Sequence, residues 1–287
     1  MAYPLTHITA RWWSRILLFL LLWVLFSIAE YSNYPEYLPW LSCIAAALLT
    51  EYLRRGNSIV GLGLSFKKQT FFREVFWGIF SAIIAIGGVI LTAIILGARF
   101  KSVEDPLFFL PLVLLLLKIF ILAAGEEFLF RGIIFQAVVE RFKMPMAVAL
   151  STAIFIYGHL ANPGATVFSS VNIALANLVF CTMYLSTGSL WPSIAFHFSW
   201  NFAQALMGLR VSGLNFGDPL LKMDLLKIPQ NLHWIIFSPE FGIEAGFTTT
   251  LVLILAIIIL PRFLKTSAFA SAGVFKRRFA ESEFTAG

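Results

Sequence analysis

The feature that most constrains this chain is a long stretch without charge. From Met144 to Leu209, 66 consecutive residues include no Asp, Glu, Lys or Arg. That length is enough for about three membrane-spanning helices of roughly 20 residues each. The whole chain of 287 residues has the same character, with 59% hydrophobic and only 13% charged residues, where a soluble domain has about 25% charged residues. The sequence therefore predicts a polytopic integral membrane protein.

Apolar segments of spanning length recur along the whole chain, and they are separated by turn residues such as Asn162-Pro163-Gly164. Helices satisfy their own backbone hydrogen bonds in lipid, and no strand pattern competes with them, so the predicted fold class is all-α. We expect one membrane domain over residues 1–287 with about eight transmembrane helices. Their expected ranges are 15–31, 37–53, 74–98, 107–141, 145–161, 166–186, 190–209 and 245–263.

Basic residues are distributed unevenly between the loops that these helices define. With the N-terminus in the cytoplasm, fourteen Lys and Arg residues fall in cytoplasmic segments and five in outer loops. Such an excess is typical of the cytoplasmic loops of membrane proteins. We therefore expect both termini in the cytoplasm, with a cytoplasmic tail over about 265–287. This distribution suits contact with anionic lipid better than binding of nucleic acid. The expected location is a bacterial inner membrane, with a eukaryotic ER membrane as the alternative.

The N-terminal segment and the two cysteines have simple interpretations. Arg11 and Arg15 precede an apolar run over residues 16–29, as in a secretory signal. No Ala-x-Ala cleavage site follows, so we expect a retained first helix. Cys43 and Cys181 lie in apolar stretches without a Cys-x-x-Cys motif. They are therefore expected to be small buried side chains rather than a disulfide scaffold.

The first polar motif is Glu126-Glu127-x-x-x-Arg131, within the predicted helix 107–141. Ionisable residues inside a membrane are costly and usually face a polar cavity, so they are candidates for a functional site. Adjacent residues of a helix point about 100° apart. Glu127 and Arg131 have the i,i+4 spacing of an intrahelical ion pair, which leaves Glu126 free for water or a metal. The alternative is that the three side chains form a structural polar cluster.

Two histidines lie in later predicted helices. His159 ends the pattern Phe155-x-x-x-His159, and His197 begins the pattern His197-x-x-x-Asn201, whose two side chains share one helical face. A single histidine in a membrane helix is often a hydrogen-bonded packing residue. Two histidines together with a glutamate pair indicate instead a water-filled reaction chamber within the membrane.

These residue types can carry out hydrolysis. Glu126, His159 and His197 would form a zinc site with an open position for water. Either the metal or a carboxylate would activate water for attack on a carbonyl group, and Asn201 would donate to the oxyanion. At about 1.5 Å per residue, His197 is expected roughly 10 Å below the cytoplasmic surface. The depth of Glu126 depends on where its helix begins.

The three motifs, in this order, resemble the CPBP family of intramembrane proteases, also called the Abi or CAAX-protease-and-bacteriocin-processing family. The resemblance covers about residues 107–209, the expected catalytic core. It implies an eight-helix-type fold with a cavity that faces the cytosol. It also implies hydrolysis of a peptide bond in a prenylated CAAX-type substrate, a bacteriocin precursor or another membrane-proximal peptide. The family's chemistry leaves a metal-dependent and a glutamate-dependent mechanism open, so Zn²⁺ is a candidate cofactor.

The resemblance also implies a role for each polar residue of the motifs. Glu126 and His159 would activate water. His197 and Asn201 would stabilise the oxyanion or help to hold a metal. Glu127 and Arg131 would support the site.

Two other classes of function use the same residues. A proton- or cation-coupled transporter would pass its ion along Glu126, His159 and His197, and a membrane scaffold would use none of them for chemistry. The sequence shows no inverted repeat, and the paired motifs suit hydrolysis better than transport. The expected partners are therefore membrane lipid and a membrane-associated peptide or protein substrate, without nucleic acid and with no oligomeric state implied.

Overall fold

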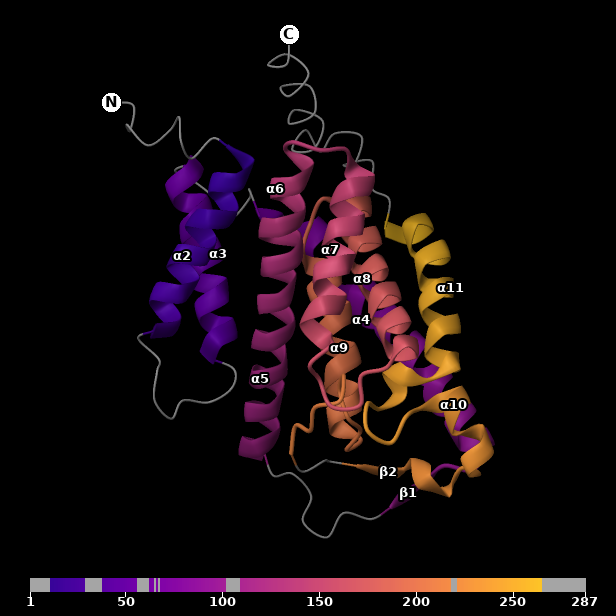
Figure 1. Ribbon diagram of the computed structural model, residues 1–287. Coiled ribbons are helices and arrows are strands. Elements are labelled where there is room, and N and C mark those ends of the chain that lie inside the picture. Colours follow the sequence, from indigo (N-terminus) through magenta and orange to yellow (C-terminus); the bar gives the residue numbers. More distant parts are fainter. Residues whose placement is uncertain are drawn as a thin grey trace, which may run out of the picture.

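The computed structural model describes residues 11–28, 38–55, 62–64, 66, 68–101, 109–217 and 221–264. Helices make up most of this part of the chain (Figure 1). The expected cytoplasmic tail lies outside the described residues, as do parts of several connecting segments.

Each of the eight predicted apolar segments coincides with a helical segment. The fourth is a continuous helix of three parts, α5, the π-helix η2 and α6. The bounds are α2 (Trp12–Ile28), α3 (Leu38–Arg55), α4 (Lys68–Ile95), α5 (Phe109–Glu127), η2 (Phe128–Phe135), α6 (Gln136–Val139), α7 (Met144–His159), α8 (Val167–Thr187), α9 (Trp191–Leu206) and α11 (Phe247–Leu264).

Four helical segments of the described chain are long and apolar enough to cross a membrane by length and composition. They are Thr70–Ile95, Phe109–Val139, Val167–Thr187 and Phe247–Leu264. The helices α2, α3 and α7 are apolar but shorter. The fold is thus mostly helical and that of an integral membrane protein, while the number of eight spans stays a prediction.

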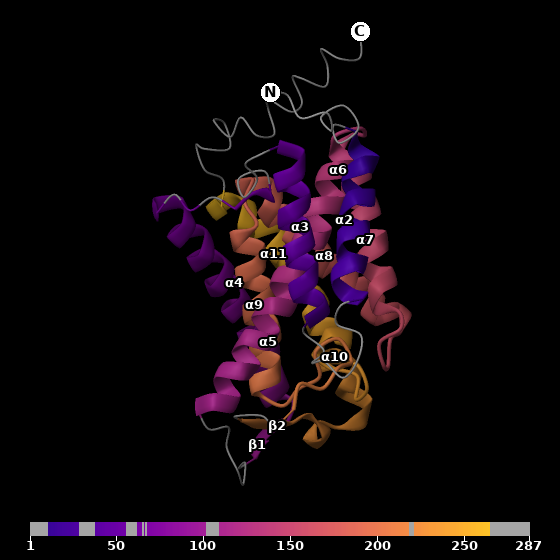
Figure 2. The ribbon, with the colours of Figure 1, turned by 90° about the vertical axis from the view of Figure 1, so that its left-hand side faces the viewer.

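The long helices run up and down between two ends of the bundle (Figures 1 and 2). At one end lie the turn between α6 and α7, the beginnings of α2 and α4, and the last turn of α11. Arg73 of α4 donates there to the backbone carbonyl of Leu264, at 3.2 Å. At the other end lie the short helix α10 (His233–Ile236) and the strands β1 and β2. We name these the α6–α7 end and the α10 end.

The outward faces of the helices are apolar. Leu17, Leu21, Ile84, Ile95 and Leu110 are each more than half exposed. Contiguous apolar surface of this kind is uncommon on soluble monomers, and it matches hydrocarbon contact in a membrane. The central core is formed instead by buried side chains of α4, α8, α9 and α11.

Helices α4 and α9 approach each other closely at a glycine. A Cβ atom added at Gly78 would lie 2.5 Å from the carbonyl oxygen of Pro192 and 2.7 Å from the Cβ atom of Ala195. Small residues allow this close backbone approach between membrane helices. The contact fixes α9, which carries His197, against the core.

A small antiparallel sheet at the α10 end was not expected from the sequence. Strands β1 (Arg99–Lys101) and β2 (Lys222–Asp224) pair in the register Phe100 to Met223. Three residues are too few to give an alternating pattern. Lys101 Nζ lies 2.6 Å from Asp224 Oδ2, and its hydrogen bond and charge hold the pKa of that carboxyl below its ordinary value.

Candidate active site

The helix that carries the two glutamates changes its hydrogen-bonding pattern at the motif. It is α-helical up to Glu127, π-helical from Phe128 to Phe135, and α-helical again from Gln136. π-Helical turns within α-helices are rare and frequently occur at functional sites. Arg131 lies in this widened segment and both glutamates lie directly before it.

The predicted ion pair between Glu127 and Arg131 is present. Arg131 Nη1 lies 3.1 Å from Glu127 Oε1, and both side chains are completely buried. Arg131 Nη2 donates to Asn177 Oδ1 of α8 at 2.8 Å. A buried charge is tolerated only when it is paired and hydrogen-bonded, and Arg131 has both kinds of partner.

Arg131 is also surrounded by aromatic rings. Its guanidinium carbon lies 4.8 Å from the ring centroid of Phe180, 5.3 Å from that of Phe155 and 5.9 Å from that of Phe130. Cations within about 6 Å of a ring face are attracted by its quadrupole. Phe155 of the second motif therefore contributes to the site by holding Arg131.

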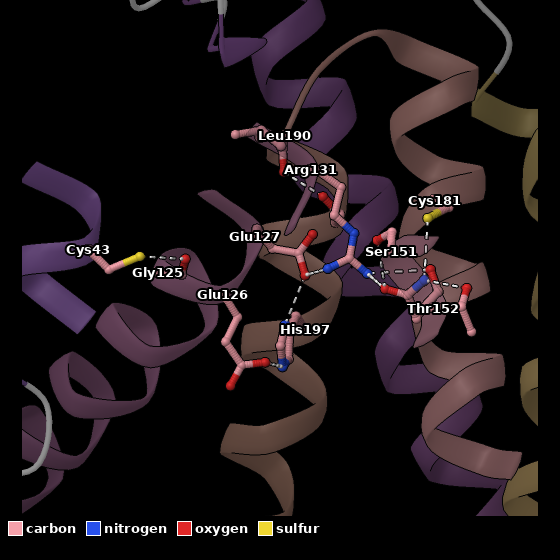
Figure 3. A network of polar contacts seen from close by, with 12 residues as sticks. Cys43, Gly125, Glu126, Glu127, Arg131, Ser151, Thr152, Cys181, Leu190 and His197 are labelled. Carbon is pink, nitrogen blue, oxygen red and sulfur yellow. Dashed lines mark hydrogen bonds and ion pairs between the residues drawn. The ribbon is translucent and has the colours of Figure 1, made fainter. Parts of the chain in front are cut away.

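His197 connects the two glutamates (Figure 3). Its Nδ1 lies 3.0 Å from Glu127 Oε1, and its Nε2 lies 3.8 Å from Glu126 Oε2. An ionised carboxylate only accepts hydrogen bonds, so Nδ1 carries a proton and donates it to Glu127. Phe180 stacks on the imidazole, with ring centroids 4.6 Å apart and an interplanar angle of 19°. The orientation of the His197 ring is thus fixed from two sides.

Glu126 lies at the wall of a cavity. Its side chain is almost completely buried, and its Oε2 makes no hydrogen bond with the described part of the chain. The cavity has a volume of about 160 Å³. It brings together four of the predicted site residues, namely Glu126, His159, His197 and Asn201.

His159 is the last residue of α7 and is held by its own helix. Its Nδ1 lies 2.8 Å from the carbonyl oxygen of Phe155, and its ring contacts the ring of Phe155 at 4.6 Å between centroids. Because a carbonyl oxygen only accepts, Nδ1 is the protonated nitrogen. In neutral His159 the other nitrogen, Nε2, is then an acceptor for a group in the cavity.

The zinc site predicted from the sequence stays a prediction. Among the described residues, no group of three or more His, Cys, Asp or Glu side chains is placed to hold a metal ion. His197 donates to Glu127 from Nδ1, which leaves its Nε2 available to the cavity. Glu126, His159 and His197 nevertheless line one cavity.

Two networks that support the site were not predicted. Asn177 joins Arg131 to α7, because its Nδ2 donates to Thr152 Oγ1 at 2.9 Å. The signal for it in the sequence is an asparagine within the apolar segment 166–186. Buried Glu244 accepts hydrogen bonds from Trp200 Nε1 at 2.8 Å and from Ser212 N at 2.7 Å. Glu244 thereby ties α9 to a loop that lines the cavity.

The helical bundle of this membrane protein thus holds a carboxylate–histidine centre in its interior. Residues 108–203 match the family model described as type II CAAX prenyl endopeptidase Rce1-like. The match includes all three motifs, so the resemblance predicted from the sequence is confirmed over this segment, and it supports a CAAX-type intramembrane protease. No curated protein and no solved structure gives a match.

Proposed function

We propose that this protein is an intramembrane endopeptidase in which Glu126 activates water for attack on a peptide bond. One observation carries the proposal. Glu126 presents a buried carboxylate oxygen without a hydrogen-bond partner beside a cavity that is also lined by two histidines and an asparagine. An unsatisfied buried carboxylate is costly, and a bound water would satisfy it.

In the proposed reaction, Glu126 acts as general base. Its carboxylate accepts a proton from water while the water oxygen attacks the carbonyl carbon of the substrate. His159 Nε2 would hold the same water as a second acceptor. Protonated Glu126 then delivers the proton to the leaving amine. These proposed steps use only side chains of the protein itself.

His197 and Asn201 are proposed to stabilise the negative charge on the tetrahedral intermediate. They lie one turn apart on α9, and both line the cavity. The amide of Asn201 makes no hydrogen bond within the described chain and can donate to the oxyanion. Because His197 Nδ1 donates to Glu127, His197 would donate to the oxyanion from Nε2.

Glu127 and Arg131 are proposed to support the site rather than to contact the substrate. Neither lines the cavity. Glu127 Oε1 lies within 3.1 Å of both Arg131 Nη1 and His197 Nδ1. It therefore holds the His197 ring with Nε2 directed to the cavity, as carboxylates hold catalytic histidines in other enzymes.

The test is cleavage of internally quenched peptides by the full chain, purified in detergent. Candidate substrates are a prenylated CAAX peptide, its unprenylated form and peptides that carry a bacteriocin leader. Glu126→Gln removes the base with little change in volume, so we expect a loss of about 10²–10⁴-fold in kcat. Glu240→Gln is the matched control, because Glu240 is exposed and lies outside the cavity.

The alternatives predict other results. A transporter would lose proton-coupled flux in the Glu126→Gln variant, and a scaffold would lose little. Full cleavage activity in that variant would contradict the proposed role of Glu126. No cleavage of any of these peptides by folded wild-type protein would count against the endopeptidase.

A further inference from the structure

An apolar groove lies on the outer surface of the bundle between α7 and α8. The two helices are neighbours that run in opposite directions (Figure 1), and the groove is lined by residues within 144–156 of α7 and 178–185 of α8. Its volume is about 700 Å³. Ala149 and Ala153 are exposed and lie one turn apart in its wall. Their short side chains leave open the space that larger side chains would fill.

The lining offers an occupant only apolar contacts. Its single polar side chain is that of Thr152. Thr152 Oγ1 donates to the carbonyl oxygen of Val148 at 2.8 Å and accepts from Asn177 Nδ2 at 2.9 Å. The hydroxyl group is therefore already bonded within the protein. An occupant would be held along the groove by van der Waals packing, as apolar groups are inside a membrane.

Positive charge lies at one end of the groove. Arg141 and Lys143 are exposed and directly precede Met144, which lines the groove at the α6–α7 end. Neither forms an ion pair within the described part of the chain, and the neighbouring acid, Glu140, is bound to Arg15 at 3.1 Å. The 66 residues that begin at Met144 include no charge. The groove thus has a cationic end and an otherwise apolar length.

The length of the groove distinguishes between possible occupants. From Met144 to Ile156 the helical rise is about 18 Å. This is close to the roughly 15 Å of hydrocarbon in one leaflet, whereas a spanning helix needs about 30 Å. The groove therefore matches an acyl chain that descends from the membrane surface at the α6–α7 end, and it is too short for a spanning helix of a partner.

From the apolar lining, the length and the charge we infer that this groove binds an anionic phospholipid. Its acyl chain would lie between α7 and α8, and its phosphate would lie at Arg141 and Lys143. Basic residues beside a groove between membrane helices favour anionic headgroups over zwitterionic ones. The inference does not rest on the proposed function, because no residue of the groove lines the cavity beside Glu126.

A bound lipid would hold α7 and α8 together at the position where Asn177 joins them. Asn177 bonds to Thr152 of α7 at 2.9 Å and to Arg131 at 2.8 Å. A ligand that binds only the folded protein raises its stability. We therefore expect an anionic phospholipid to raise the midpoint of thermal unfolding in detergent.

The test is native mass spectrometry of the full chain, freed of lipid in detergent and then mixed with phosphatidylglycerol or phosphatidylcholine. The two lipids carry the same acyl chains. We expect one phosphatidylglycerol molecule to bind about 25-fold more tightly than phosphatidylcholine, since each of two basic residues near anionic lipid contributes about fivefold. The unfolding midpoint should rise with phosphatidylglycerol. Equal binding of the two lipids by wild type would overturn the inference.

The cationic end is tested by neutralising it. The double variant Arg141→Gln with Lys143→Gln should bind the two lipids equally. Its matched control is Lys222→Gln with Lys227→Gln, since these two lysines are also exposed but lie at the α10 end. The control should keep the preference for phosphatidylglycerol. A preference that survives in the first double variant would overturn the position of the phosphate.

The apolar part is tested by filling it. Ala149→Phe places a ring in the groove, and Ala45→Phe places one at an exposed position of α3, outside the groove. We expect retention of phosphatidylglycerol to be lost in Ala149→Phe and kept in Ala45→Phe, with both variants folded. Equal retention in the two variants would overturn the inference. So would a wild-type dimer that dissociates only in Ala149→Phe, because the groove would then belong to a second copy of the chain.

Discussion

His197 Nδ1 lies 3.0 Å from Glu127 Oε1, on the same carboxylate oxygen that pairs with Arg131 at 3.1 Å. One buried oxygen therefore holds both the arginine of the first motif and the histidine of the third. This relationship separates the roles of the adjacent glutamates. Glu127 holds Arg131 and His197 in position, and Glu126 faces the cavity.

This division of roles predicts that the same substitution lowers stability at Glu127 but not at Glu126. Glu127→Gln leaves Arg131 without its charge partner, and breaking a buried pair in this way costs about 3–5 kcal/mol. We expect the midpoint of thermal unfolding in detergent to fall clearly. Glu126→Gln removes a carboxylate whose Oε2 has no hydrogen-bond partner, so its midpoint should stay near that of wild type. Equal midpoints for the two variants would show that Glu127 does not have this structural role.

A second prediction concerns the ring that stacks on His197. Phe180 contacts both His197 and Arg131. Phe180→Leu keeps an apolar side chain but removes the stack and the cation–π contact, which is worth about 2 kcal/mol when buried. We expect kcat to fall more than KM changes, because the imidazole becomes free to rotate.

The matched control for this variant is Phe135→Leu. Phe135 is also buried, but it packs against Tyr184 rather than the site. Similar losses of stability in both variants, with loss of kcat only in Phe180→Leu, would support the positioning role. An unchanged kcat in Phe180→Leu would exclude it.

The helices could be predicted from the sequence because length and hydropathy alone determine them. The predicted segment 166–186 and α8 at Val167–Thr187 differ by one residue at each end. The ion pair of Glu127 with Arg131 followed from spacing on one helix. These are local properties, and local patterns in a sequence report them directly.

Other features depend on packing between distant segments. The π-helix over Phe128–Phe135 is a run of mostly apolar residues without a pattern that separates it from an α-helix. Glu244 lies outside the segment of the three motifs, and only the fold brings it to Ser212.

A third prediction follows from the Glu244 network. Glu244 Oε2 accepts from Ser212 N at 2.7 Å and from Ser212 Oγ at 2.6 Å. Ser212 has a positive φ of 48°, which is uncommon for a residue with a side chain. The carboxylate offsets this strain, since hydrogen bonds to charged groups contribute about 1.5–3 kcal/mol.

Glu244→Gln replaces one acceptor oxygen by a donor, so we expect the loop over residues 211–216 to loosen. Hydrogen exchange at the Ser212 amide should become faster, and kcat/KM should fall because the loop lines the cavity. Glu240 is exposed and precedes Glu244 in the chain. Glu240→Gln should therefore leave both hydrogen exchange at the Ser212 amide and kcat/KM unchanged. Wild-type exchange at Ser212 in the Glu244→Gln variant would contradict this role.

The last prediction concerns metal. His197 Nδ1 is committed to Glu127, and His159 Nδ1 is bonded to the carbonyl oxygen of Phe155. The Nε2 atoms of both rings stay available to the cavity, and the proposed glutamate-dependent mechanism uses them without a bound ion. We expect cleavage by purified wild-type protein to be unchanged after dialysis against a zinc chelator, with metal content measured by mass spectrometry. A thermolysin-type zinc protease treated in parallel serves as the control, since it loses activity when its metal is removed. Loss of cleavage on chelation, with recovery on stoichiometric Zn²⁺, would show that the side chains rearrange around a metal. It would also make Glu126 a ligand or a base beside the ion rather than the sole activator of water.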